Sequence, residues 1–131
     1  MKIKALVLNK KGKLAEKEIH NTLEDLQKIV EGYIEIPYLS EVFAENDIDI
    51  IINEEGKLIN LTPSIAVIDK ENGRILDIVH GRCIFTSHDE DGETIGLNEE
   101  QIMIVERELK VSVDLINPNT FDSFTVKALF V

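Results

Sequence analysis

The sequence lacks several residue types on which whole classes of protein depend. It has no tryptophan, 5% aromatic residues and a single cysteine, Cys83. One cysteine excludes an intramolecular disulfide and supplies too few thiolates for a typical structural zinc site, so a reducing cytoplasm is expected. With so few aromatic side chains, the core must consist mainly of Ile, Val and Leu, which favour strands.

Long apolar runs are also missing. The apolar stretch near the N-terminus covers only residues 5–8, which is too short for the apolar region of a signal peptide. Runs such as Ile50, Ile51 and Ile52 are of strand size, far below the roughly 20 residues that cross a bilayer. We therefore expect no membrane segment.

Basic residues are scarce. There are 14 Lys and Arg against 25 Asp and Glu, for a formal net charge of -11. A phosphate backbone would be repelled, so direct binding of nucleic acid is disfavoured. What is present is typical of a globular protein: 44% hydrophobic and 30% charged residues in a chain of 131, which fits one domain.

Alternating apolar residues and turn residues predict strands. Residues 3–8 and 14–19 are expected to form one hairpin, and residues 47–53 and 58–61 a second one. A strand is also expected at 33–38, and a long one over 75–87 that is interrupted at Gly81. The last strand is predicted at 124–131, after the break at 117–119.

Two longer segments have the spacing of amphipathic helices. The first is capped by either Asn21 or Thr22, and Gly32 is the expected left-handed residue at its end. The second begins at Asn98, with Ile102, Val105 and Leu109 on one face. We therefore predict a single α+β domain over residues 1–131, mainly an antiparallel sheet built from hairpins, with two main helices.

A shorter helical turn is predicted at residues 64–68. Thr62 followed by Pro63 matches an N-cap residue with proline in the first turn. The free amides at such a helix start suit an anion. Thr62 and Ser64 are therefore the candidate ligand residues of one alternative function, the binding of a small molecule or nucleotide.

The charges are distributed unevenly along the chain. Residues 1–19 hold six lysines and two glutamates, whereas residues 20–131 hold eight basic and twenty-three acidic residues. There are six acids and no base in residues 41–55, and seven acids and no base in residues 83–106. These stretches are either solvated loops and helix faces or a surface that binds a basic protein partner. The candidate residues of that acidic surface are Glu41, Glu45, Asp47, Asp49, Glu54, Glu55, Asp89, Glu90, Asp91 and Glu93.

No recognisable catalytic or metal-binding motif occurs. Residues 87–92 resemble the start of a calcium-binding EF-hand loop, but Asn98 stands where the bidentate carboxylate is needed. His80 and Cys83 should point to opposite faces of their strand, with Cys83 a small buried hydrophobe and His80 at the surface or at a strand end. We assign no catalytic residue, metal or cofactor and expect no enzyme, although a site assembled from scattered acids stays open as a third class.

The order of several segments resembles a known family. These segments are the helix at residues 23–31 with Gly-Tyr-Ile-Glu after it at 32–35, Asn-Glu-Glu-Gly-Lys-Leu at 53–58, Pro63 and Ala66, and Ile-Val-His-Gly at 78–81. They are similar to a family classified only as a domain of unknown function, which occurs in bacteriophages and in bacterial plasmids or prophages.

The resemblance covers about residues 3–105 and leaves about 106–131 as a C-terminal extension. It implies an accessory protein of a mobile element in the cytoplasm of a bacterial host. We expect it to bind a host or phage macromolecule through its acidic surface, as an inhibitor or an anti-defence factor. The strand at 124–131 is apolar on both faces, so it lies either in the centre of the sheet or at an interface, and a homodimer through it stays open.

Overall fold

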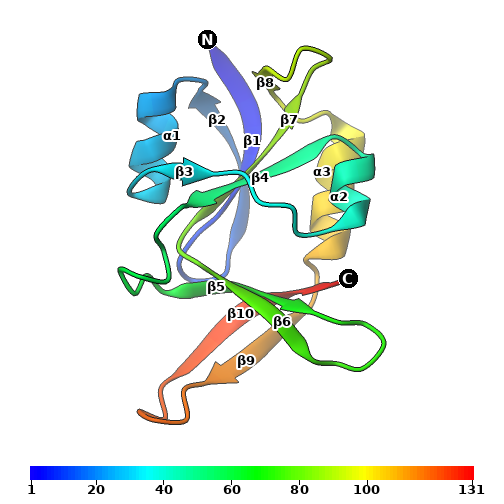
Figure 1. Cartoon of the computed structure of the whole chain (residues 1–131). Helices are drawn as coiled ribbons and strands as arrows, with labels where there is room; N and C mark the ends of the chain where they lie inside the picture. The colour runs from blue at the N-terminus through cyan, green and yellow to red at the C-terminus, as the bar shows by residue number, and fades with distance from the viewer.

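Ten strands divide into two β-sheets in the computed structural model, which describes residues 1–131 (Figure 1). The first sheet has the order β2-β1-β7-β4-β3, with β8 also paired to β7. Its strands are β1 (Lys2–Leu8), β2 (Leu14–His20), β3 (Ile34–Glu35), β4 (Ile48–Asn53), β7 (Cys83–His88) and β8 (Thr94–Ile95). The second sheet has the order β6-β5-β10-β9, formed by β5 (Pro63–Ile68), β6 (Ile75–His80), β9 (Ser112–Ile116) and β10 (Ser123–Phe130).

Three helices accompany the sheets: α1 (Leu23–Val30), α2 (Glu41–Glu45) and α3 (Glu99–Glu108). All strand pairs are antiparallel except β5 with β10. The predicted α+β class with a mainly antiparallel sheet is therefore confirmed. None of the helices has the length and apolar character that a membrane crossing requires.

The first predicted hairpin is confirmed. β1 and β2 pair along their full lengths, from Lys2 opposite His20 to Leu8 opposite Leu14. The turn between them contains Gly12 in the left-handed region, with φ 78°, which glycine adopts at little steric cost.

Helix α1 begins as predicted but ends differently. The Thr22 side chain accepts a hydrogen bond from the Asp25 backbone amide at 3.2 Å. The left-handed residue at the end of the helix is Glu31, with φ 67°, and not Gly32. Gly32 instead allows the Asn53 side chain to pack closely against the backbone, because a Cβ atom there would lie 2.7 Å from Nδ2 of Asn53.

The second predicted hairpin is wrong. Residues 58–60 form turns and Leu61 belongs to no strand. Leu58 is 85% exposed, and β4 pairs with β3 and β7 instead. The backbone after β4 satisfies its hydrogen bonds locally, because Ile59 donates to the carbonyl of Glu55 and Leu61 to that of Gly56. These amides are therefore not available for a return strand along β4.

The helical turn predicted at residues 64–68 is also wrong, because these residues belong to β5. Pro63 is the first residue of the strand. Proline has no backbone N–H, and the first position of a strand tolerates this just as the first turn of a helix does. The buried Ser64 hydroxyl donates to the carbonyl of Val79 at 3.2 Å, and the carbonyl of Thr62 accepts from the amide of Gly81 at 2.8 Å. No helix N-terminus is present to bind an anion here.

Gly81 interrupts the predicted long strand, as expected, and the interruption moves the chain from one sheet to the other. β6 lies in the second sheet and β7 in the first. Gly81 has φ 90°, and a Cβ atom there would lie 2.8 Å from the Leu61 side chain. The strand expected at 33–38 is shorter than predicted, since only Ile34 and Glu35 pair with β4.

The main core lies between the two sheets. It includes Phe85 of β7 and Phe43 of α2, whose rings meet edge to face at a centroid distance of 6.1 Å. Ile102, Val105 and Leu109 enter this core as predicted. A smaller core on the other face of the first sheet is covered by α1, and it is formed by Ile3, Ala5, Ile19, Leu26, Val30, Ile51 and Ile84.

The position of strand β10 in the second sheet explains why both of its faces are apolar. It lies between β5 and β9, so the predicted central position in a sheet is confirmed, and a homodimer through this strand stays a prediction. Leu129 enters the main core on one face, while Val126 and Ala128 form a separate cluster on the other. Residues 106–131 thus supply two of the four strands of the second sheet.

Candidate functional site

The two acidic segments of the sequence meet where β4 pairs with β7. Ile48 lies opposite Ser87 and Asp49 opposite Thr86. Because side chains alternate along a strand, Asp49 and His88 project from the same face of the sheet. We use the term His88 cluster for His88 together with Asp47, Asp49, Asp89 and Glu90, which lie around one end of these strands.

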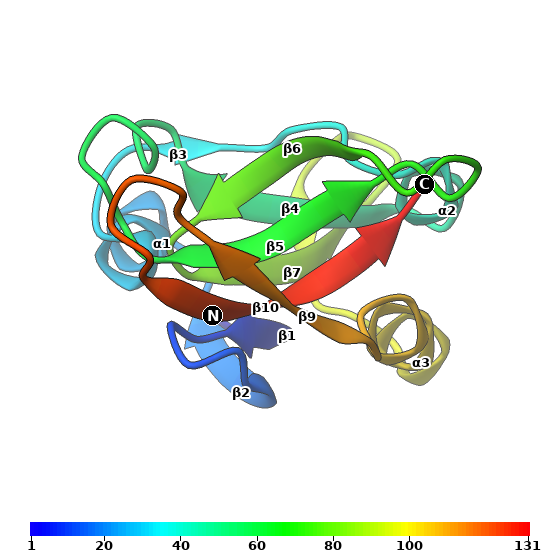
Figure 2. The same ribbon diagram turned by 90° about the horizontal axis from the view of Figure 1, so that it is seen from below.

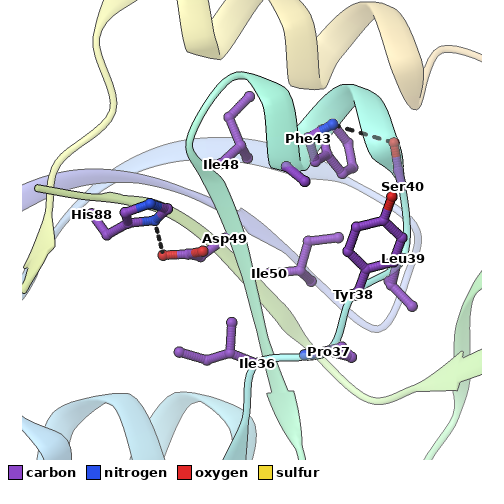
Figure 3. Close-up of a pocket in the computed structure, with 11 residues that line it drawn as sticks. Ile36, Pro37, Tyr38, Leu39, Ser40, Phe43, Ile48, Asp49, Ile50 and His88 are labelled. Atoms are coloured by element: carbon purple, nitrogen blue, oxygen red, sulfur yellow. Dashed lines mark hydrogen bonds and ion pairs between the residues drawn. The ribbon is translucent and has the colours of Figure 1, made fainter. Parts of the chain in front are cut away.

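His88 is in direct contact with two carboxylates, of which Figure 3 shows that of Asp49. Its Nδ1 lies 3.0 Å from Oδ2 of Asp49, and its Nε2 lies 3.5 Å from Oδ1 of Asp47. The Asp49 side chain is only 20% exposed, whereas that of Asp47 is 66% exposed. The hydrogen bond that His88 donates to the Asp49 carboxylate raises the pKa of His88 above its usual 6.5, and the negative charges of Asp49, Asp47 and Asp89 raise it further.

A buried hydrogen-bond network holds this arrangement in place. The hydroxyl of Ser87 donates to the carbonyl of Asp47 at 2.8 Å. The side-chain amide of Gln101 donates both to that hydroxyl, at 3.0 Å, and to the carbonyl of Asn46, at 2.9 Å. Gln101 also completes a capping box with Asn98 at the start of α3. Helix α3 therefore fixes the position of β4 relative to β7.

A pocket of about 250 Å³ adjoins the His88–Asp49 pair. In Figure 3 this pair lies on one side of β4, and Tyr38 and Phe43 lie on the other. The pocket is mainly apolar and is lined by Ile36, Pro37, Tyr38, Leu39, Ser40, Phe43, Ala44, Ile48, Asp49, Ile50 and His88. Asp49 and His88 are the only acidic or basic residues of this lining, so the site is an apolar cavity with this pair at its border.

Helix α2, which forms one wall of this pocket, was missed from the sequence. The Ser40 hydroxyl accepts a hydrogen bond from the Phe43 amide at 3.3 Å and caps the helix. The signal was present, since a serine followed by Glu41 is a common helix start, but a helix of five residues has too little periodicity to stand out.

The other acidic candidates lie outside the His88 cluster. Glu41 and Glu45 are exposed on α2, and Glu54 and Glu55 follow the opposite end of β4. Glu54 and Glu55 line a different pocket of about 330 Å³, next to the ion pair between Lys57 and Asp77.

The remaining two acids belong to the loop before β8. The backbone amides of Asp91 and Glu93 each donate to the Asp89 carboxylate at 2.9 Å. The ten acidic candidates therefore form several groups, and the structure brings together only Asp47, Asp49, Asp89 and Glu90 around the histidine.

Cys83 has no features of a nucleophile. It is fully buried, and burial raises the pKa of its thiol to about 12. Its nearest polar side chain is Ser64, with Oγ 3.5 Å from Sγ. His80 lies at the end of β6 with Nδ1 2.7 Å from the carbonyl of Leu61. The structure therefore confirms that Cys83 is a small buried hydrophobe and that His80 is a strand-end residue.

Metal-ligating side chains do not converge anywhere. No group of three or more His, Cys, Asp or Glu residues is arranged to hold a metal ion. In the His88 cluster the imidazole is in contact with carboxylates, which favours its protonated form, and a protonated imidazole cannot ligate a metal.

Fold and site together define a small α+β protein with two sheets and an acidic cluster around one histidine. The chain belongs to the family described as domain of unknown function DUF3846, whose model matches residues 1–110. The expected membership of a family of unknown function is confirmed. Neither a curated protein nor a solved structure matches the chain at a significant level.

The matched region contains the complete His88 cluster and all of α3. It ends before β9 and β10, although these strands complete the second sheet.

Proposed function

We propose that this is a non-enzymatic accessory protein of bacteriophages or other mobile elements that binds a basic protein in the bacterial cytoplasm through the His88 cluster. The observation that supports this most is the meeting of Asp47, Asp49, Asp89 and Glu90 around His88, next to an apolar pocket that Asp49 and His88 help to line. Lysine or arginine side chains of the partner contact the carboxylates, and an apolar side chain beside them enters the pocket.

The two parts of this site have different physical roles. Exposed ion pairs stabilise a complex by only about 0–1 kcal/mol each, so the acids mainly steer and select a basic partner. Burial of one leucine-sized side chain contributes about 1.5–3 kcal/mol. The pocket is smaller than the roughly 300–1,000 Å³ typical of small-molecule sites, so it fits a protein side chain better than a cofactor.

An acidic surface of this kind can act by competition. A protein that binds DNA or RNA has a basic surface that attracts carboxylates as it attracts phosphates. Occupation of that surface by the His88 cluster would block the nucleic acid, which accounts for the proposed inhibitor or anti-defence role. The alternative of a nucleotide binder has less support, because the helix start that motivated it at Thr62 and Ser64 is a strand.

The test is binding by two matched double variants. Asp47→Asn with Glu90→Gln removes two charges from the cluster, and asparagine tolerates the left-handed backbone of Asp47, with φ 56°. Glu54→Gln with Glu55→Gln removes the same number of charges at the other end of β4. The probe is a fluorescent peptide of alternating lysine and leucine, followed by host-lysate capture at low and high salt.

We expect salt-sensitive binding by the wild type, at least a tenfold weaker affinity for the cluster variant and unchanged affinity for the control variant. Equal losses in both variants would show that binding depends on net charge alone. Absence of any salt-sensitive partner, together with no binding of the peptide, would refute the proposed function.

A further inference from the structure

A third pocket lies on the face of the first sheet that α1 covers only in part. Helix α1 has eight residues and is about 12 Å long, whereas the seven-residue strands of the β1–β2 hairpin are about 23 Å long. The helix packs on Ile3, Ala5 and Ile19 and leaves the part of the hairpin nearer its turn uncovered. We use the term hairpin pocket for the cavity of about 460 Å³ at this place, which Ile29 of α1 also lines.

The floor of the hairpin pocket is apolar. Val7 opposes Ala15 in the hairpin, so both project to the same side of the sheet, together with Ile19. β2 is an edge strand of the first sheet, and Figure 2 shows no element beyond it, so a ligand can approach from that side. The volume falls within the roughly 300–1,000 Å³ typical of small-molecule sites, and no aromatic residue lines the pocket. An aliphatic group fits this floor, whereas a nucleotide base would find no ring to stack on.

All charges in the lining are positive. Lys17 opposes Ala5 and therefore lies on the pocket side of β2, whereas Glu16 and Glu18 project from the other side. Lys17 is exposed and forms no ion pair. Arg82 is the second charged residue of the lining, and its side chain is 40% exposed. In a chain with a net charge of -11, a cavity with two cations and no carboxylate is a local exception.

One carboxylate contacts these cations from outside the lining, and it is already neutralised. Glu31, at the end of α1, lies 2.8 Å from Nζ of Lys10 and 3.5 Å from a guanidinium nitrogen of Arg82. The hydrogen bond from Lys10, together with the positive charges of Lys10 and Arg82, lowers the pKa of Glu31, so this carboxylate is ionised at neutral pH. Lys10, Lys17 and Arg82 against Glu31 alone leave two positive charges uncompensated.

The distribution of charge favours a small anion over a polymer. At physiological salt, charges farther away than about 8 Å are largely screened, so a small anion in the pocket interacts mainly with the local cations. A nucleic-acid backbone would extend over the rest of the chain, where residues 20–131 hold eight basic and twenty-three acidic residues.

We infer that the hairpin pocket binds a small phosphate monoester with an aliphatic group. Such a monoester carries close to two negative charges at neutral pH, which matches the two uncompensated positive charges. Arg82 and Lys17 contact the phosphate, and the aliphatic group lies on Val7 and Ala15. Asn9 of the lining supplies a further donor, because its Oδ1 accepts from two backbone amides of the turn and its Nδ2 has no partner.

Isothermal titration calorimetry with hexyl phosphate tests this inference. Hexyl phosphate should bind more tightly than inorganic phosphate, which lacks the aliphatic group, and than hexanol, which lacks the charge. It should also bind more tightly than hexyl sulfate, which has one negative charge fewer. Cosedimentation with vesicles of phosphatidylcholine and phosphatidic acid, but not with phosphatidylcholine alone, would identify the monoester as a lipid headgroup; binding of hexyl phosphate without cosedimentation would identify it as a soluble compound.

Matched variants locate the binding. Lys17→Gln should weaken the affinity for hexyl phosphate roughly tenfold, the effect of losing one hydrogen bond between charged groups. Lys2→Gln is the control, because Lys2 is exposed on β1 and projects from the other side of the hairpin. Glu31→Gln should tighten binding, because it releases Lys10 and Arg82, and a gain of affinity cannot result from misfolding.

Thermal unfolding followed by circular dichroism confirms that each variant is folded before its affinity is interpreted. Equal losses in Lys17→Gln and Lys2→Gln would overturn the inference, since binding would then depend on net charge alone. An affinity for hexyl phosphate no greater than that for phosphate, hexanol or hexyl sulfate would also overturn it, as would weaker binding by Glu31→Gln. Binding of the lysine–leucine peptide should be unchanged in Lys17→Gln, which separates this inference from the proposed function.

Discussion

Replacement of Gln101 by alanine tests how the protein holds its two acidic segments together. Gln101 is 9% exposed and makes three side-chain hydrogen bonds. Its amide donates to the carbonyl of Asn46 and to the hydroxyl of Ser87, and its Oε1 accepts from the backbone amide of Asn98. The substitution removes the hydrogen-bond partner of all three groups in a region that is poorly accessible to water.

The expected loss of stability follows from these contacts. Each hydrogen bond contributes about 0.5–1.5 kcal/mol net, and the gain in helix propensity offsets only a few tenths, so the free energy of unfolding should fall by about 3 kcal/mol. An unfolding entropy of about 2.1 cal/mol/K per residue converts this into a decrease in Tm of roughly 10 °C for a chain of this size. Such a loss is a large part of the roughly 5–15 kcal/mol typical of a whole domain.

Urea denaturation followed by circular dichroism measures this change. Met103→Ala is the control, because Met103 lies on the same helix, is 68% exposed and makes no comparable contacts. A surface substitution of this kind should change stability by less than about 0.5 kcal/mol. If Gln101→Ala were no less stable than Met103→Ala, the network would not be what fixes β4 against β7.

Three further predictions concern single residues. Because Asp49 raises the pKa of His88 above 6.5, the stabilisation from protonated His88 is complete below pH 6.5 and is lost as the pH rises through the raised value. Urea titrations should therefore show wild type and His88→Gln converging in stability at alkaline pH, and a constant difference would contradict this. Gly56→Ala should destabilise by about 1–3 kcal/mol in thermal unfolding, since its Cβ would lie 2.7 Å from the carbonyl oxygen of His80; an unchanged Tm would refute that contact. Iodoacetamide should modify Cys83 only in denaturant, as judged by mass spectrometry, because the thiol is buried with a pKa of about 12; rapid modification of the native protein would disprove its burial.

The elements that the sequence predicts well have local signals. The β1–β2 hairpin has a glycine turn between two alternating segments. Helices α1 and α3 have Thr22 and Asn98 as capping residues and apolar side chains at spacings of three and four. Hydrogen bonds within a few residues of one another determine these structures, so a short window of sequence contains the information.

The errors occurred where two local structures share one signal. Pro63 is compatible with both the first turn of a helix and the first position of a strand. The segment forms a strand because it pairs with β6 and β10. Residues 58–61 are apolar enough for a strand, but no partner is available to them. The division into two sheets at Gly81 likewise depends on contacts between distant segments.

The candidate site was predicted only in part. The acidic residues were identified, but the contact between His88 and Asp49 joins positions 39 residues apart. That contact depends on the register between β4 and β7, whose residues Ile48, Ile50 and Phe85 enter one core while Ile51 and Ile84 enter another. Strands that are apolar on both faces do not specify their register by pattern, so the sequence contained no signal for the pair.

The parallel pairing of β5 with β10 has a consequence for biosynthesis. β10 begins at Ser123, more than fifty residues after β5 ends at Ile68. At about 5–20 residues per second, a ribosome needs roughly 3–11 s to produce the intervening chain. During that time β5 has an unpaired edge that another nascent chain could join. Its residues Ile65, Ala66 and Val67 are all buried in the folded protein. The yield of folded protein in a cell therefore depends on how well this strand is shielded during those seconds of translation.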